Sequence, residues 1–208
     1  MTLPKPYYQE GRVKERPILF SGPMVRAILD GSKTQTRRVA KLTPSAAVKE
    51  PGGHRRWHPA DPEAVAACPY GIPGDHLWVR ETWAPHPDDL GALYQATDPG
   101  WDDNDSGLLW KHSIHMPRWA SRITLEITGV RVQRVQEISV ADAMAEGPPC
   151  CCNIEREHHR DCSWTDKEHF RHLWDSINAK RGYGWDVNPW VWALTFKRTG
   201  CDARHPGQ

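Results

Sequence analysis

The stretch of sequence that decides how this chain is interpreted reads Gly31-Ser32-Lys33-Thr34-Gln35-Thr36-Arg37-Arg38. The residues before it predict a short amphipathic helix, with Ser21 as the N-cap and Pro23 in the first turn. Gly31 then takes the left-handed conformation that commonly ends a helix. The chain therefore leaves a helix at this point and places a lysine and a hydroxyl three positions apart, beside two arginines.

Lys33 and Thr36 are a candidate base and nucleophile. A lysine can remove the proton of a nearby hydroxyl when burial or neighbouring cations lower its pKa, and Arg37 and Arg38 are such cations. Lys33 reaches Thr36 only if the chain bends, because side chains of an extended strand alternate between faces. The alternative is a helix C-terminus whose basic residues complement the helix dipole. Spacing alone leaves both interpretations open.

The pattern Gly-x-Lys-Thr-x-Thr-x-Arg after a short helix resembles the signature of the ASCH family, small β-barrels related to the PUA RNA-binding fold. Threonine at position 36 resembles the bacterial N(4)-acetylcytidine amidohydrolases of that family. In that subgroup a lysine, a threonine and a downstream glutamate form the proposed catalytic triad. The resemblance places these roles on Lys33, Thr36 and Glu146, the last through a local match of residues 138–146.

Two further segments, 74–83 and 184–192, resemble the longer ASCH proteins of phages and prophages. The resemblance implies an α+β fold, a PUA-like β-barrel with short helices at the barrel ends and long insertion loops. The implied organisation is a polar N-terminal arm at 1–15, an ASCH/PUA-like domain at 16–198 with insertions at about 40–73 and 148–163, and a tail at 199–208.

Periodicity predicts the elements of this domain. Alternating apolar residues predict strands, and two capping boxes, Ser139 with Asp142 and Thr165 with Glu168, predict two helices. The chain is expected to turn near Gly129 between two of the strands. The predicted strands are Arg16–Phe20, His76–Trp83, Ala92–Ala96, 123–128, Val130–Gln136 and 190–196.

Composition and charge agree with one domain. With 208 residues the chain can bury a substantial core, while 18 prolines, 16 glycines and only 38% hydrophobic residues indicate long surface loops. The net charge of +1 means that any basic surface must be local, and it weighs mildly against tight non-specific nucleic-acid binding. No apolar run reaches the ~18 residues of a membrane span, and the N-terminus lacks a signal-peptide pattern. We therefore expect a cytoplasmic protein without a membrane partner.

Arg80, Glu81 and Trp83 are candidate substrate-binding residues. Two charges inside an otherwise apolar strand require partners, and a functional interpretation points Arg80 into the pocket of Lys33 and Thr36, as a fork donor to a base carbonyl or a phosphate. The alternative is that each charge faces solvent or pairs with a neighbour.

The loop 180–185 places two cations beside Tyr183 and Trp185. Such a loop can stack a base and contact a phosphate, and with Arg37 and Arg38 it is the best candidate for nucleotide contact. It is equally compatible with a surface turn before the last strand.

Cys150, Cys152, His158 and Cys162 are the candidate metal ligands. Thiolates and an imidazole within this span can close a tetrahedral structural zinc site, although the spacing matches no standard zinc finger. The alternative is a loop with reduced, unliganded cysteines. Catalysis is expected to require no cofactor.

Three functions follow as hypotheses. An amidohydrolase would remove an acyl group from the exocyclic amine of a cytosine nucleoside, with Thr36 as nucleophile, Lys33 as base and Glu146 as proton carrier or orienting group. In this hypothesis Lys33 is expected to be exposed in the pocket and to add little to stability. A PUA-like module would bind single-stranded RNA in the same cleft without chemistry. A zinc-stabilised phage accessory protein would bind another protein in this cleft.

Overall fold

The computed structural model describes residues 13–41, 48–49, 55–56, 65–98, 100, 108–147 and 164–199. A five-stranded mixed sheet has the order β1-β5-β8-β9-β2, in which β1 pairs parallel with β5 and the other neighbours are antiparallel. Its strands are β1 (Glu15–Leu19), β2 (Gln35–Val39), β5 (His76–Arg80), β8 (Thr124–Arg134) and β9 (Trp190–Thr199). Two small antiparallel pairs are β3 (Val48–Lys49) with β4 (Arg55–Arg56), and β6 (Trp83–Pro85) with β7 (Ala92–Tyr94).

Helices cover this sheet and its ends. The α-helices are α1 (Gly22–Leu29), α3 (Val140–Ala145) and α4 (Asp166–Asn178). The 3-10 helices are η3 (Ser113–His115), η4 (Arg118–Ala120), η5 (Val135–Glu137), η7 (Ala179–Arg181) and η8 (Trp185–Val187). Each helix in the described part of the chain is too short or too polar to cross a membrane.

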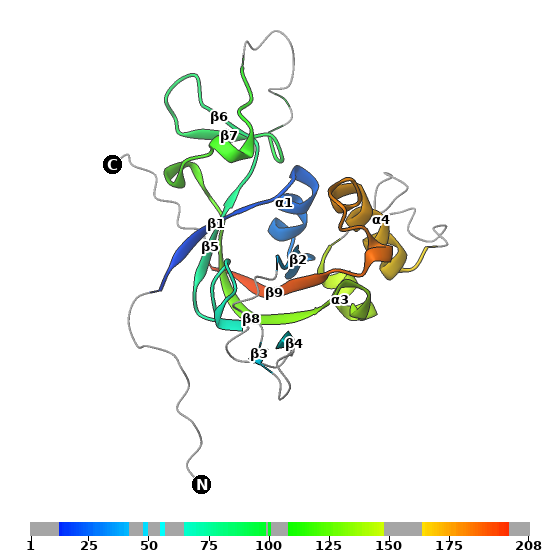
Figure 1. The fold of residues 1–208 in the computed structure, drawn as a ribbon. Helices are drawn as coiled ribbons and strands as arrows, with labels where there is room; N and C mark the ends of the chain where they lie inside the picture. Colours follow the sequence, from blue (N-terminus) through cyan, green and yellow to red (C-terminus); the bar gives the residue numbers. More distant parts are fainter. Residues whose placement is uncertain are drawn as a thin grey trace.

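The fold is α+β, as the sequence predicts. In Figure 1, β8 and β9 run beneath α1, while β1 and β5 stand across their ends. Within the described ranges no pairing joins β1 to β2, the two edges of the sheet, so closure into a barrel stays a prediction.

The core lies on both faces of the sheet. On β9, Trp192, Leu194 and Phe196 pack with the apolar face of α1, whereas Val191 points the other way and packs with Phe170 of α4. This is the alternation expected of a strand buried on both faces. It holds α1 and α4 on opposite sides of β9, next to the edge strand β2.

The helix starts are predicted correctly from local signals. The Thr165 hydroxyl accepts from the Glu168 backbone N–H at the start of α4, and the Ser139 hydroxyl does the same for Asp142 at the start of α3. Ser21 is the N-cap of α1, but its side chain makes no capping hydrogen bond.

Two strand predictions differ most from the structure. The chain does not turn at Gly129, because β8 is a single strand whose register against β9 shifts between Ile127 and Gly129. An extra residue at such a bulge bends a strand without ending it. The strand predicted over 76–83 ends at Arg80, and the Glu81 N–H donates to the Met116 sulfur instead of continuing the sheet.

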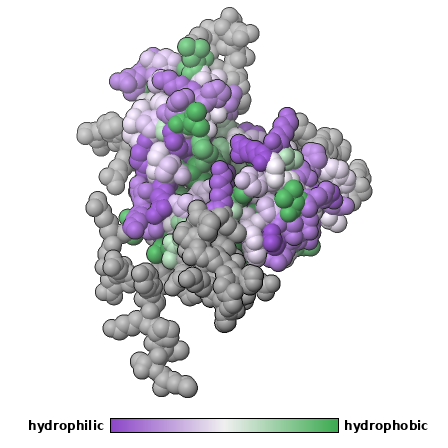
Figure 2. All heavy atoms as spheres, in the orientation of Figure 1, coloured by the Kyte–Doolittle hydropathy of each residue, from purple (hydrophilic) through white to green (hydrophobic). Residues whose placement is uncertain are grey.

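The chain beyond Arg80 forms a lobe around β6 and β7 that projects from the sheet (Figure 1). Figure 2 shows hydrophobic side chains on the surface of this lobe. Among the described residues of the lobe, the large apolar side chains that are exposed are Leu90, Leu109, Ile114 and Trp119.

Candidate functional site

The turn between α1 and β2 positions Lys33. Gly31 has a φ of 83°, the left-handed conformation predicted for it, and the Ser32 N–H donates to the Asp30 carboxylate at 2.9 Å. The Lys33 N–H then returns to the Ala27 carbonyl of α1 at 2.9 Å. The Thr34 N–H donates to the Ala145 carbonyl at 2.8 Å, which fixes the turn against the end of α3. The loop is therefore held at both ends by backbone bonds, and the Lys33 side chain lies next to the residue that follows α3.

Lys33 is buried, with 2% of its surface exposed, which corrects the expectation of an exposed pocket side chain. Its Nζ donates to the Gln35 carbonyl at 2.8 Å, to the Glu146 carbonyl at 2.7 Å and to Glu146 Oε2 at 3.0 Å. These three bonds use all the donors of an ammonium group. Among the described residues, none of its bonds goes to the Thr36 hydroxyl, so the direct contact that would let Lys33 act as the base for Thr36 is not present.

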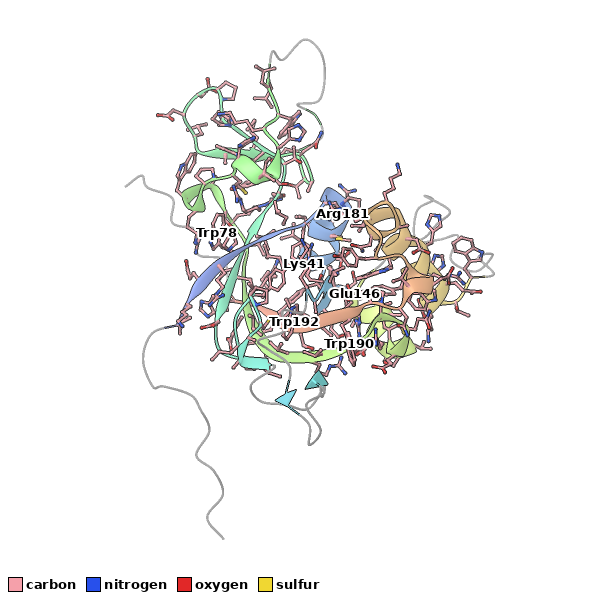
Figure 3. All side chains as sticks on the ribbon, viewed as in Figure 1. Lys41, Trp78, Glu146, Arg181, Trp190 and Trp192 are labelled. Atoms are coloured by element: carbon pink, nitrogen blue, oxygen red, sulfur yellow. The ribbon has the colours of Figure 1, made fainter. Side chains whose placement is uncertain are left out.

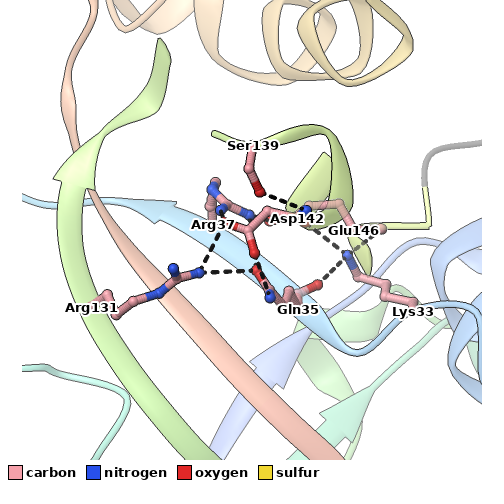
Figure 4. A network of polar contacts seen from close by, with 7 residues as sticks. All are labelled: Lys33, Gln35, Arg37, Arg131, Ser139, Asp142 and Glu146. Atoms are coloured by element: carbon pink, nitrogen blue, oxygen red, sulfur yellow. Dashed lines mark hydrogen bonds and ion pairs between the residues drawn. The ribbon is translucent and has the colours of Figure 1, made fainter. Parts of the chain in front are cut away.

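Glu146 joins Lys33 to a second cation. It caps the C-terminus of α3, and its Oε1 accepts from Arg37 Nη1 at 2.9 Å. Arg37 Nη2 also donates to Asp142 Oδ2 at 2.9 Å, and Arg131 Nη2 reaches the same oxygen at 3.0 Å. Figure 4 shows this network between β2, β8 and α3. Three cations share two carboxylates, so the network carries one excess positive charge.

Burial and charge shift the pKa values of two groups in this network. Burial lowers the pKa of Lys33 below 10.5, and the cations of Arg38 and Arg37 add to the decrease, while Glu146 opposes it. Burial acts to raise the pKa of Asp142, but hydrogen bonds from Gln35 and Arg131 together with the arginine charges outweigh it, so this pKa lies below 3.8. A lysine whose pKa is lowered in this way is more easily converted to the neutral amine that a general base requires.

Thr36 borders a cavity of about 800 Å³ between β2, α4 and the turn after α4. Glu146 and Arg37 also border it, whereas Lys33 borders a separate cavity of about 230 Å³. Within the described chain the Thr36 side chain makes no hydrogen bond. The structure therefore places Thr36 and Glu146 on one cavity and Lys33 behind Glu146, in contact with its carboxylate.

The wall of the larger cavity is rich in cations and aromatic rings. Glu146 is its one carboxylate among the described residues. The charged and aromatic lining residues are Arg37, Arg38, Lys41, Tyr70, Glu146, Phe170, Trp174, Arg181 and Tyr183. Figure 3 labels three of them: Glu146 follows α3, Lys41 follows β2, and Arg181 ends η7. The cavity wall is therefore a local basic surface on a chain whose net charge is only +1.

Arg80, Glu81 and Trp83 do not border this cavity. Arg80 donates to the Ile114 carbonyl and lies over the Trp78 ring at 5.4 Å. Glu81 is buried and receives two bonds from Arg122, at 3.0 and 2.9 Å. The expectation that Arg80 shares a pocket with Lys33 and Thr36 is therefore corrected, because the chain leaves the main sheet after Arg80.

The two hydrogen bonds from the Arg122 guanidinium give Glu81 a neighbouring partner. This agrees with the alternative in which each charge of the strand pairs with a neighbour. Burial raises the pKa of Glu81, and the Arg122 guanidinium opposes the increase. Trp83 is buried with Met116 and Ala120 in the core of the β6–β7 lobe. Among the three residues, Glu81 and Trp83 therefore contribute to the packing and charge pairing of the lobe.

The residues of the loop 180–185 have two different positions, some at the larger cavity and some in the hydrophobic core. Tyr183 borders the cavity and its carbonyl accepts from Trp174 Nε1 at 2.8 Å. Trp185 is buried against Phe170, with ring centroids 6.2 Å apart, so it supports the cavity wall from behind.

Sequence reasoning missed the other groups of the site. Asp142 was assigned only to a helix start, although Asp142 and Glu146 lie four residues apart and so share one face of α3. Tyr70 lies within the predicted insertion, and no sequence signal marked it as part of the site. The four-residue spacing on a helix could have identified Asp142, whereas only the folded chain reveals Tyr70.

The predicted zinc ligands Cys150, Cys152, His158 and Cys162 lie outside the described residues. No group of three or more potential metal ligands occurs in the part of the chain that the structure describes. The structural zinc site therefore stays a prediction from the sequence.

If this cluster binds zinc, the purified protein should contain about one equivalent of metal, and removal of the metal should lower the melting temperature, since structural zinc contributes folding free energy. Elemental analysis and thermal unfolding with and without a chelator measure both quantities. Cys68 is buried and distant in sequence from the cluster, so Cys68→Ser is a control that should leave the metal content unchanged. If the protein contains no metal and the chelator does not change its melting temperature, the cysteines belong to a loop that binds no zinc.

Comparison with known proteins gives weak likenesses. No family model matches the chain, and no curated protein matches it. Among solved structures, protein EF3133 from Enterococcus faecalis V583, which carries the family model DUF984, has 9% identity and a TM-score of 0.43 over 96% of this chain and 88% of its own. The ASCH domain from Lactobacillus crispatus JV V101 has 12% identity and a TM-score of 0.43 over 89% of this chain and 79% of its own. At these values neither match assigns the chain to a family.

Proposed function

We propose that this protein is an ASCH-type amidohydrolase with a PUA-like barrel fold, and that it removes an acyl group from the exocyclic amine of a cytosine nucleoside. The observation that carries the proposal is the buried pair of Lys33 and Glu146 behind a cavity that Thr36 borders. A base, a carboxylate and a hydroxyl in one region are the groups that acyl transfer needs. The resemblance of residues 31–38 to the Thr-containing ASCH signature supports the same assignment.

The proposed reaction proceeds through an acyl-enzyme. Lys33 enters the reaction as the neutral amine, the form toward which its lowered pKa shifts it. It accepts the Thr36 hydroxyl proton through one water as the Thr36 oxygen attacks the acyl carbonyl. The carbon–nitrogen bond breaks as Lys33 passes this proton to Glu146 Oε2, 3.0 Å from its Nζ, and Glu146 delivers it to the leaving amine of cytosine. Water then attacks the threonine ester and releases the carboxylic acid.

The arginines stabilise the negative charge that develops on the carbonyl oxygen. Arg37 is held by Glu146 and Asp142, so its position is fixed before the substrate enters. A donor whose position is fixed in advance stabilises the transition state without reorganising.

The second candidate function is single-stranded RNA binding without chemistry. The observation that favours it is the combination of cations and aromatic rings on one cavity wall, which is typical of sites that stack bases. The two functions differ in whether a covalent bond is broken, and turnover distinguishes them.

We expect the purified protein to convert N(4)-acetylcytidine to cytidine. Chromatography of the products measures the rate of this conversion. Thr36→Ala removes the nucleophile and should reduce the rate by at least roughly 10²-fold, whereas Thr36→Ser keeps a hydroxyl and should retain measurable turnover. Absence of cytidine from all N(4)-acyl cytosines tested, with cytidine oligonucleotides still bound, would favour the binding module. Equal rates for the alanine and serine variants would exclude Thr36 as the nucleophile.

A further inference from the structure

The larger cavity holds more positive charge than the proposed chemistry uses. Of its four cations, Arg37 is committed to Glu146 and Asp142. Arg38, Lys41 and Arg181 remain, and within the described residues none of them has a carboxylate partner. The whole chain carries a net charge of only +1, so this concentration of charge is specific to the cavity.

Arg38 is the most constrained of the three. Its guanidinium lies over the Phe20 ring at 5.1 Å and donates to the Leu19 carbonyl at 2.6 Å. Its Nε is buried and has no partner among the described residues. Arg38 is half-buried and has no carboxylate partner among the described residues, so a bound anion would add charge-assisted bonds to its guanidinium.

Lys41 and Arg181 come from separate elements and meet the same cavity. Lys41 follows β2 by two positions, and Arg181 ends the 3-10 helix after α4. Both are exposed and neither bonds to another described residue. Lys41 and Arg181 thus place a cation on each wall, and the Arg38 guanidinium lies between the start of α1 and β2. Three cations in this arrangement can bind a multiply charged group whose oxygens point in several directions.

The remaining lining fits a nucleoside. Tyr70 and Tyr183 offer rings on which a base or ribose can pack, and Thr36 with Glu146 marks the reacting end. A cavity of about 800 Å³ exceeds what a single base needs and falls in the range of sites for larger organic ligands, roughly 300–1,000 Å³.

We infer that this cavity binds a phosphorylated cytosine nucleoside, with the base directed to Thr36 and Glu146 and the phosphate held by Arg38, Lys41 and Arg181. The inference rests on the proposed function for the orientation of the base, whereas the phosphate site rests on the cations alone. The substrate class is then a nucleotide rather than a bare nucleoside. The same phosphate chemistry is present in a free nucleotide and in a strand, and the experiment separates these sources.

The binding test uses the full chain and needs no turnover. Affinities for cytidine, its 5′- and 3′-monophosphates and tricytidylate are measured by calorimetry at two salt concentrations. One of the monophosphates should bind about 10- to 100-fold more tightly than cytidine, because several charge-assisted bonds are added. If tricytidylate binds more tightly than the monophosphates and its affinity depends more steeply on salt, the phosphate recognised by the cavity belongs to a nucleic-acid strand. If tricytidylate shows no such increase in affinity, the phosphate belongs to a free nucleotide.

Variants assign the effect to the cavity. Arg181→Ala and Lys41→Ala should each reduce the affinity for the monophosphate several-fold more than that for cytidine. Lys180→Ala is the matched control, because this exposed lysine neighbours Arg181 and does not border the cavity. Equal affinities of cytidine and both monophosphates, or an equal loss in Lys180→Ala and Arg181→Ala, would overturn the inference.

The two proposals fail separately. Hydrolysis of N(4)-acetylcytidine with no effect of the phosphate on binding or on kcat/KM overturns the phosphate site and leaves the amidohydrolase. Tighter binding of the monophosphate that depends on Arg181, without hydrolysis of any N(4)-acyl cytosine, supports the phosphate site and overturns the amidohydrolase.

Discussion

Replacing Lys33 with arginine should reduce amide hydrolysis by roughly 10²- to 10⁴-fold, the usual contribution of a general base. Arginine keeps the positive charge but does not lose its proton near neutral pH. Burial lowers the pKa of Lys33 below 10.5, and only the neutral amine accepts a proton from Thr36. Wild-type kcat should therefore rise with pH through an inflection below 10.5, and steady-state kinetics across pH measure it for both proteins.

Stability must be followed beside activity, because Lys33 is enclosed by Gln35 and Glu146 and the larger guanidinium has to fit there. Lys180→Arg, at an exposed position, is the control and should change neither kcat nor the melting temperature. Full turnover in a folded Lys33→Arg protein would rule out Lys33 as the base. If that protein also kept its affinity for cytidine oligonucleotides, RNA binding would become the leading function.

Glu146→Gln should destabilise the protein by about 3–5 kcal/mol, the cost of breaking a buried ion pair at one partner. The carboxylate accepts from Lys33 at 3.0 Å and from Arg37 at 2.9 Å, and the Lys33 and Arg37 side chains are fully buried. Loss of its charge leaves Lys33 without a carboxylate in a medium of low dielectric constant and leaves Arg37 with Asp142 alone. Urea denaturation followed by circular dichroism measures the free energy of unfolding.

The matched control is Glu126→Gln. Glu126 pairs with Lys197 at 3.0 Å, but the two side chains are 30% and 62% exposed, so its removal should cost less than about 1 kcal/mol. The double variant Lys33→Met with Glu146→Gln removes the cation that Glu146→Gln leaves without a carboxylate, so it should be more stable than Glu146→Gln alone. If Glu146→Gln and Glu126→Gln lose the same stability, the buried pair does not hold the end of α3 in place.

Local interactions explain which parts of the fold could be predicted. The start of α4 needs only Thr165 and Glu168, three residues apart, and the end of α1 needs only the left-handed Gly31. The alternation of β9 is equally local. The bulge at Gly129 was missed because it depends on pairing with β9, more than sixty residues away in the sequence.

The candidate site divides in the same way. Residues 31–38 by themselves indicated a lysine and a hydroxyl in a basic turn after a helix, because turn and helix signals act over a few residues. The sequence by itself also determined the capped helices and the alternation of residues along β9. The resemblance assigned Lys33, Thr36 and Glu146 to one site, but only the tertiary structure decided that Lys33 bonds to Glu146, 113 residues away, and not to Thr36, three residues away. It also decided that Arg80 and Glu81 serve the β6–β7 lobe, whereas Tyr70, Lys41 and Arg181 border the cavity. The physical reason is that a buried charge takes the partner that packing brings within hydrogen-bond distance, and packing depends on contacts between elements far apart in the chain.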